Sequence, residues 1–301
     1  MLVIIMALVP LISLIALGYA FKHFHFLSEE FWRGAERLNY FILFPILLFK
    51  NLAFVSLELT NLVWVIGAML MTILLVSCAL WLAKFYFHIK PAQFGVYVQS
   101  HIRFNTYMGL ALVSSLFGAY GLKIFAMMIA IAIPTVNIIS LLAFAQQNHS
   151  IQNTLLAIVK NPLIIGCIVG LLFNLTGLDL ATGLHDLISL LASVSLPLGL
   201  LAVGAALQFQ ALKLDIWRLS LNSLGRLLVV PLLAYGVTQV LALPTLESLI
   251  VLTFFALPTA SAAYILTRYL KGNHQLMAGV ISLQTVLFVL SFPLLMYFFK
   301  I

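Results

Sequence analysis

Charge is scarce in this sequence. Only 8% of its 301 residues are Asp, Glu, Lys or Arg, against roughly 25% in a typical soluble domain, while hydrophobic residues make up 64%. A water-soluble fold of this size has too little interior to hide so much apolar surface, whereas a lipid bilayer acts as an apolar solvent for it. The composition therefore excludes a soluble globular protein and indicates a chain embedded in a membrane.

Cysteines and catalytic motifs are equally sparse. Cys78 and Cys167 each lie inside an apolar run, where a thiol usually serves as packing, so we expect neither a disulfide nor a metal site. The chain has no phosphate-binding glycine loop, nucleophile elbow or HExxH motif. We therefore predict that the protein is not an enzyme, has no catalytic residues and needs no cofactor.

Ten apolar runs, separated by short polar connections, fill the chain. Each is long enough to cross the hydrocarbon core as a helix, which takes about 20 residues. We therefore expect an all-α polytopic membrane protein with ten transmembrane helices. The runs are approximately Leu2–Phe21, Gly34–Phe54, Leu62–Phe85, Gln93–Phe117, Leu122–Ala145, Leu155–Thr176, Leu184–Leu207, Trp217–Leu241, Leu246–Tyr269 and His274–Phe299.

Basic residues are distributed unevenly between the connections on the two sides. By the positive-inside rule the richer side is cytoplasmic, so both termini are expected on the periplasmic side of a bacterial inner membrane. The same distribution accounts for the net charge of +7 without a nucleic-acid partner. The richer side carries Lys22, Arg33, Arg37, Lys84, Lys90, Lys160, Lys213, Arg218, Arg268 and Lys271, and the other side carries Lys50, Lys123 and Lys300.

The two halves of the chain are related by a shift of 152 residues. The matching pairs are Pro10 and Pro162, Gly18 and Gly170, and Pro45 and Pro197. Because five spans is an odd number, the second copy enters the membrane from the opposite side, which is the inverted-repeat plan of many secondary transporters. We expect one membrane domain made of a first five-helix repeat, residues 1–148, and a second, inverted repeat, residues 149–301.

Polar side chains gather in the middle of the fourth run, at His101, Arg103, Asn105 and Thr106. An arginine near the bilayer centre costs about 2.5–3.5 kcal/mol on insertion scales. Arg103 lies about ten residues into the run, on the order of 15 Å at the helical rise, which is far for snorkelling. We therefore favour an Arg103 that faces a hydrated cavity over one that snorkels to the surface.

The ninth run is interrupted by Pro258, which removes a backbone hydrogen bond and clashes with the preceding turn. A full break is tolerated in a membrane only where protein buries it or a cavity adjoins it. Thr259 and Ser261 follow at once and are candidates to cap a second half-helix. Taken alone, a simple proline kink is the better interpretation.

The fourth and ninth runs together indicate one site. Broken helices at matching places in two repeats point to a binding site at the membrane centre, where half-helix N-termini carry partial positive charge. All eight carboxylates of the chain lie in connections or at the ends of runs. With Arg103 and no fixed negative charge, such a site suits an anion, most simply a carboxylate.

Four further polar side chains lie within runs. Asn137 lies one turn after Pro134, and its amide is placed either to contact a bound carboxylate or to bond a neighbouring helix. Gln284 and Thr285 in the tenth run have the same two interpretations. Arg226 lies only about eight residues from a cytoplasmic connection, so its head group is expected to snorkel.

Several segments resemble motifs of the bacterial auxin efflux carrier family, in the family's order and over nearly the whole chain. Plant members have a proline before the asparagine of the fourth run, where this chain has Phe104. The segments are Arg103–Leu112 in the fourth run, Lys160–Leu163 at the sixth, Leu196–Leu198 with Gly204 in the seventh, and Ala256–Ala260 in the ninth.

The resemblance implies two inverted five-helix repeats in which broken helices 4 and 9 cross. It also implies an elevator-type carrier, in which helices 1, 2, 6 and 7 form a scaffold and a homodimer interface. Asn105 and the backbone at Pro258 would contact the substrate carboxylate. The family includes plant auxin exporters and bacterial permeases for malonate and other carboxylates.

We therefore predict a secondary transporter that moves a small organic anion, a mono- or dicarboxylate, across the inner membrane, with membrane lipid as its surroundings. Two alternatives stay open: a sodium-coupled bile-acid-type symporter, and a membrane sensor that binds organic anions without transporting them. The expected substrate-binding residues are Arg103, Asn105, Thr106, Asn137, Pro258, Thr259 and Ser261.

Overall fold

The computed structural model describes residues 2–54, 61–144, 160–213 and 215–299, and every regular element in these ranges is helical. The expected boundary between the repeats, at residues 148 and 149, lies outside them. The elements are α1 (Leu2–His23), α2 (Glu29–Leu38), η1 (Asn39–Leu43), α3 (Phe44–Ala53), α4 (Leu62–Phe87), α5 (Pro91–Ile102), α6 (Thr106–Phe144), α8 (Pro162–Thr176), α9 (Thr182–Ala205), η2 (Phe209–Lys213), α10 (Ile216–Leu224), η3 (Gly225–Val229), α11 (Val230–Val240), α12 (Thr245–Ala256), α13 (Ala262–Tyr269) and α14 (His274–Phe298).

Six of the described helical segments are long and apolar enough to cross a membrane. They are α1, α4, the segment Pro91–Phe144 that contains α5 and α6, α9, the segment Ile216–Val240 from α10 to α11, and α14. The shorter helices α8 and α12 are also apolar. These segments confirm the all-helical, multi-pass membrane fold predicted from the apolar runs.

The helix α4 shows why these segments suit lipid. Val65 and Thr72 lie on its buried face, while Leu74 and Leu82 on the other side are exposed and apolar. The hydroxyl of Thr72 donates to the carbonyl of Ala68 in its own helix at 2.8 Å, so no polar group is left unpaired there. A helix that is apolar on every side is typical of a membrane span.

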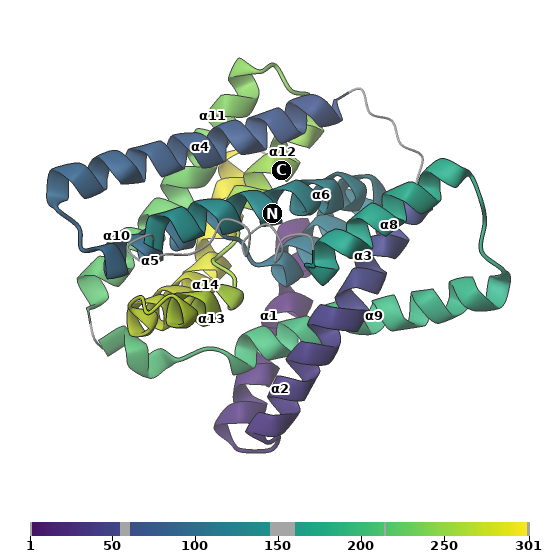
Figure 1. The fold of residues 1–301 in the computed structure, drawn as a ribbon, viewed down its shortest axis with the longest axis horizontal. Helices are drawn as coiled ribbons and strands as arrows, with labels where there is room; N and C mark the ends of the chain where they lie inside the picture. Colours follow the sequence, from purple (N-terminus) through teal and green to yellow (C-terminus); the bar gives the residue numbers. More distant parts are fainter. Residues whose placement is uncertain (1, 55–60, 145–159, 214, 300–301) are drawn as a thin grey trace.

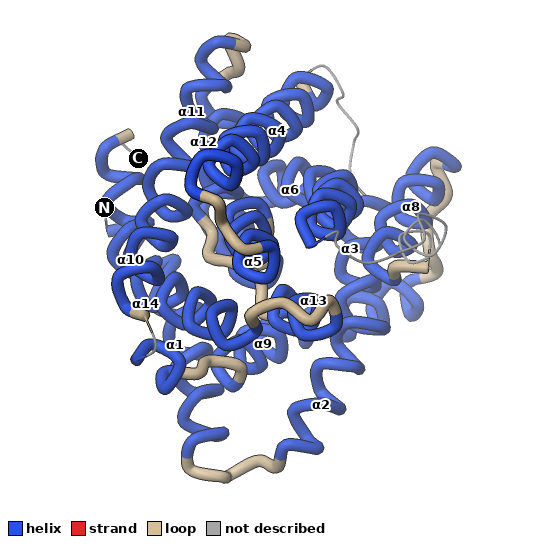
Figure 2. Tube along the Cα trace, turned by 60° about the vertical axis from the view of Figure 1, so that its left-hand side comes forward, coloured by secondary structure: helices blue, strands red, loops and turns tan. Residues whose placement is uncertain are grey.

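The helices form two groups, which can be followed in Figure 1. The first group, called the frame, consists of α1, α2, η1, α3, α8 and α9, and within it α3 packs chiefly against α8 and α1 against α9. The second group, called the crossing bundle, consists of α4, α5, α6 and α10 to α14. The first turns of α1 and the last turns of α14 lie near each other in both Figure 1 and Figure 2.

Helices of the frame approach so closely that only glycine fits at their contacts. A Cβ on Gly18 would lie 2.0 Å from the carbonyl oxygen of Leu201, and a Cβ on Gly204 would lie 1.9 Å from that of Ile15. Small residues that allow close backbone approach are the usual means of packing helices in lipid. The frame is therefore closely packed between α1 and α9.

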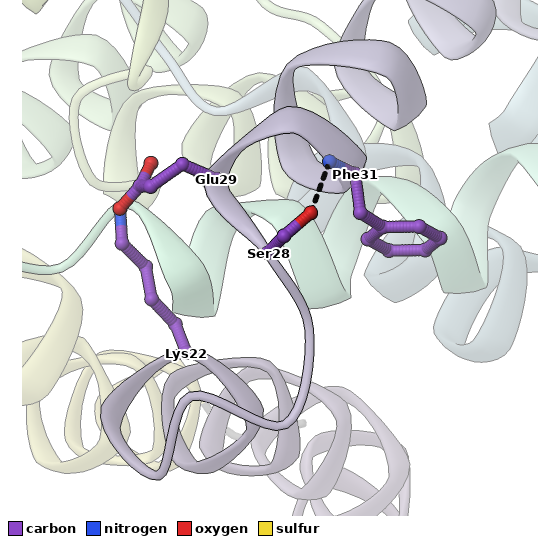
Figure 3. A network of polar contacts seen from close by, with 4 residues as sticks. All are labelled: Lys22, Ser28, Glu29 and Phe31. Carbon is purple, nitrogen blue, oxygen red and sulfur yellow. Dashed lines mark hydrogen bonds and ion pairs between the residues drawn. The ribbon is translucent and has the colours of Figure 1, made fainter.

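The turn between α1 and α2 sets the direction of α2 (Figure 3). Ser28 caps α2, since its Oγ accepts a hydrogen bond from the N–H of Phe31 at 3.2 Å. Lys22 Nζ pairs with Glu29 Oε1 at 3.0 Å. Both partners of this ion pair are partly exposed, so it contributes little stability, about 0–1 kcal/mol. From this cap the chain runs through α2, η1 and α3 without a gap.

Gly204→Ala should destabilise the frame, because the added Cβ has no room beside the Ile15 carbonyl, and overpacking of this kind costs about 1–3 kcal/mol. We expect a lower midpoint of thermal unfolding for the purified protein in detergent. Gly67→Ala is the matched control, since nothing lies within 4 Å of a Cβ there. An unchanged midpoint for Gly204→Ala would contradict the close packing of α1 and α9.

Candidate functional site

The interruptions of the fourth and ninth runs lie against each other. Residues 103–105 separate α5 from α6, and residues 257–261 separate α12 from α13. The N–H of Asn105 donates to the carbonyl of Pro258 at 2.8 Å. The two interrupted segments therefore meet through their backbones, and this meeting point is called the crossing below.

The break before α6 needs no proline, because Asn105 provides a cap. Its Oδ1 accepts a hydrogen bond from the N–H of Met108 at 3.2 Å, as an N-cap side chain does. Phe104 is 4% exposed, and its ring centroid lies 4.1 Å from that of Phe254 on α12. Capping and aromatic packing together hold the extended residues 103–105 in place.

Four buried polar residues form a closed ring of hydrogen bonds around the crossing. The N–H of Thr259 donates to Gln284 Oε1 at 2.9 Å, and Gln284 Nε2 donates to Asn222 Oδ1 at 3.1 Å. Asn222 Nδ2 donates to Ser100 Oγ at 2.8 Å, and the Thr259 hydroxyl closes the ring on the Ser100 carbonyl at 2.8 Å. The ring ties α5 and residues 257–261 to α10 and α14.

The expected capping of α13 by Thr259 or Ser261 is wrong. The Thr259 hydroxyl bonds to Ser100, and Ser261 occupies the N-cap position without a side-chain capping bond. The reason is the neighbouring helix end, since the last carbonyls of α5 have no partner within that helix. A hydroxyl placed beside one of them satisfies it.

Arg226 does not snorkel, so the expectation for the eighth run is also wrong. The residue is fully buried in the π-helical turn η3. Its Nε donates to the carbonyl of Leu257 at 3.0 Å, and its Nη1 donates to the carbonyl of His101. Because lipid offers such carbonyls no donor, the guanidinium stays with them rather than reaching the membrane surface.

Arg103 lines a cavity of about 580 Å³. Its Nη2 donates to Asn137 Oδ1, and its Nε donates to Ser140 Oγ at 3.4 Å. Both partners are neutral, and within the described ranges no carboxylate lies at ion-pair distance from this guanidinium. Arg103 is thus held in position while its charge remains uncompensated.

This cavity lies between the frame and the crossing bundle. The π-helical turn η1, of a kind frequent at functional sites, places two aromatic side chains on its wall. The frame contributes Arg33, Glu36, Arg37, Tyr40, Phe41, Ala202 and Val203, and the crossing bundle contributes Arg103, Tyr107, Asn137, Ser261, Ala262, Ile265, Leu266 and Tyr269.

A smaller cavity of about 320 Å³ adjoins the first. The two share Arg33, Glu36 and Ser261 in their walls, and the smaller one adds Lys22 and Arg268. The polar path formed by these walls therefore runs from Arg103 toward the turn between α1 and α2 shown in Figure 3.

The structure places the seven residues predicted to bind substrate in different surroundings. Those that line the larger cavity are Arg103, Asn137 and Ser261. Those that are buried at the crossing, with partners inside the protein, are Asn105, Pro258 and Thr259. Thr106 is half-buried at the start of α6 and is not among the residues that line this cavity.

Sequence reasoning did not single out Tyr40, Tyr107, Ser100 or Asn222. Asn222 offered a signal, since an asparagine inside an apolar run needs a partner. Tyr40 offered none, because a π-helical turn leaves no clear mark in the sequence. Among the described residues, no group of three or more His, Cys, Asp or Glu side chains is placed to hold a metal ion.

A multi-pass helical protein, with two interrupted helices meeting beside a cavity that lies between two helix groups, has the architecture of a membrane transporter. Residues 3–296 match the family described as membrane transport protein. The chain therefore belongs to this family, the auxin efflux carrier family, which confirms the resemblance seen in the motifs.

One relative extends this comparison. The chain is similar to an uncharacterized transporter of Methanothermobacter thermautotrophicus, with 30% identity over 128 residues. The matched stretch covers 42% of this chain and 42% of that protein, so less than half of the relative's length is involved. This likeness supports a transporter and carries no information on a substrate.

Thr259→Val should destabilise the crossing, because it leaves the Ser100 carbonyl buried without its hydroxyl donor, at a cost of about 1–3 kcal/mol. We expect a lower thermal midpoint in detergent. Thr285→Val is the matched control, since that buried hydroxyl bonds only within its own helix, to the carbonyl of Ile281 at 2.7 Å. Equal midpoints for the two variants would contradict the ring.

Proposed function

We propose that this protein is a secondary transporter that moves a small organic anion, a mono- or dicarboxylate, across a bacterial inner membrane. The observation that carries the proposal is Arg103, a guanidinium held by two neutral partners on the wall of a cavity of about 580 Å³. A largely enclosed cation with neither a carboxylate nor a helix C-terminus as its partner is costly, and a bound anion would supply the missing negative charge. Hydrogen bonds between a guanidinium and a carboxylate are also among the strongest in proteins.

The electrostatics of the cavity wall support an anion. In the described ranges the cavity is lined by three arginines, Arg33, Arg37 and Arg103, and by one carboxylate, Glu36. Both α6 and α13 begin at the crossing, and a helix N-terminus carries a partial positive charge equivalent to about half an elementary charge. Ser261, which precedes α13, lines the cavity. The excess of positive charge would attract a carboxylate.

We also propose that ten helices cross the membrane as two inverted five-helix repeats. Two glycine contacts support this arrangement. A Cβ on Gly18 would touch the backbone of Leu201, and a Cβ on Gly170 would touch the backbone of Phe49. Gly170 follows Gly18 by 152 positions, and Leu201 follows Phe49 by the same number. Each contact thus becomes the other when the two halves exchange roles, as a twofold relation between repeats requires.

The orientation of the protein follows from the residues around the cavities. Lys22, Arg33, Arg37 and Arg268, all on the side richer in basic residues, line one or both cavities. By the positive-inside rule this side is cytoplasmic. The proposed state is therefore open to the cytoplasm, with both termini in the periplasm.

An elevator-like movement, in which the crossing bundle slides along the frame, is consistent with the contact between the two groups. A Cβ on Gly199 of α9 would lie 2.4 Å from the ring of Tyr107 on α6, so ring and backbone meet without an intervening side chain. The hydrogen-bonded ring would keep the crossing rigid during the movement.

The frame helices α1, α2, α3, α8 and α9 are the proposed surface for a homodimer.

Arg103→Ala should weaken recognition of the anion. Losing a charged hydrogen bond costs about 1.5–3 kcal/mol, so we expect roughly a 10- to 100-fold weaker affinity. A thermal-shift panel of mono- and dicarboxylates on purified protein identifies a ligand, and counterflow in proteoliposomes measures its transport. Counterflow also separates a carrier from a sensor that only binds.

Arg218→Ala is the matched control, because Arg218 is an exposed arginine paired with Asp215 outside the cavity of Arg103. This variant should transport normally. Wild-type rates for Arg103→Ala, in protein that folds as well as the control, would remove the basis of the proposal.

A further inference from the structure

Arg226 lies on η3 and links the two interrupted segments by hydrogen bonds. Its Nε and Nη1 donate to the carbonyls of Leu257 and His101, which lie at the C-terminal ends of α12 and α5. The side chain is fully buried, and the acceptors of both hydrogen bonds are backbone carbonyls rather than acids. One cation thus serves two helix ends at once.

The positive charge of Arg226 matches the partial negative charge of the two helix C-termini. Each helix C-terminus carries about half a negative elementary charge, so two such ends present about one, and a guanidinium supplies one positive charge. Within the described ranges no carboxylate lies at ion-pair distance from Arg226. The guanidinium is therefore balanced by backbone carbonyls alone.

The backbone of η3 is shaped for this contact. A Cβ on Gly225 would lie 2.9 Å from Nε2 of His101, so a side chain there would press on the imidazole near the end of α5. The glycine leaves room for this imidazole beside the turn that carries Arg226. A turn of this type is often kept where it positions a functional side chain.

In many secondary transporters, carbonyls at half-helix C-termini and unwound segments bind a sodium ion. Here such carbonyls are already occupied by a side chain. We propose that Arg226 is a positioning residue that acts as a permanent cation at the crossing, in the place of a coupling metal ion. The carrier then needs no sodium to assemble its anion site. The independence from sodium rests on the proposed transport function, whereas the role of Arg226 at the crossing does not.

The first experiment tests the crossing without any substrate. Arg226→Ala should lower the thermal midpoint in detergent, and guanidinium ion at low millimolar concentration should restore part of the loss by occupying the vacated space. The same concentration should leave the wild type and the exposed-arginine variant Arg218→Ala unchanged. Arg226→Lys, which keeps the charge, should lie between the wild type and Arg226→Ala.

Two results would overturn the role of Arg226: a midpoint for Arg226→Ala equal to that of the wild type, or a loss that guanidinium does not restore in protein that still elutes as a single species. The second experiment uses only the wild type, so it does not depend on the folding of a variant. Replacing sodium chloride by choline chloride should change neither its thermal midpoint nor the counterflow rate.

A sodium-dependent midpoint or rate would refute the inference while leaving the carrier function intact. A wild type that shows no counterflow of any anion would instead refute the proposed function, and the thermal measurements on Arg226 would still decide its role at the crossing.

Discussion

Backbone groups at a break that is buried in a membrane protein have no water to bond, so the protein must supply their partners. This constraint accounts for the residues at the crossing. The N–H of Asn105 bonds to the carbonyl of Pro258, and the N–H of Thr259 bonds to Gln284. Arg226 satisfies carbonyls at the ends of both interrupted helices. Polar side chains that are rare in an apolar chain are thus concentrated where the backbone needs them.

The four helix ends at the crossing also differ in the sign of their partial charge, which is negative at the C-terminal ends and positive at the N-terminal ends. The C-terminal ends of α5 and α12 face Arg226, which offsets their partial negative charge. The N-terminal ends of α6 and α13 lie at the same crossing, and Arg103 adds a full positive charge on the cavity wall. Since its two partners, Asn137 and Ser140, are neutral, this positive charge is left for a ligand.

The position of the cavity connects this charge to the proposed movement. Its wall is built partly by the frame, through Tyr40 and Phe41 of η1, and partly by the crossing bundle, through Arg103 and Tyr107. A ligand bound there touches both groups of helices, so any displacement between them changes its surroundings. The close glycine contacts between α1 and α9 give the frame a fixed shape, against which the bundle would slide in the proposed elevator-like movement.

Composition and periodicity were enough to predict a helical membrane protein, since lipid imposes length and apolarity on every span. The interruptions of the fourth and ninth runs were predicted from their polar residues and Pro258 taken together and from the family resemblance, whereas the cap supplied by Asn105 was not. The hydrogen-bond partners of Arg226 were not predictable, since its position in the run indicated snorkelling, whereas the depth of Arg103 correctly indicated a cavity. Arg103 faces a cavity, and Arg226 is enclosed by helix ends. The carbonyls and amides around each side chain belong to helices that are far apart in the chain. Only the packing of these helices brings the groups together, so only the tertiary structure decides the surroundings of each arginine.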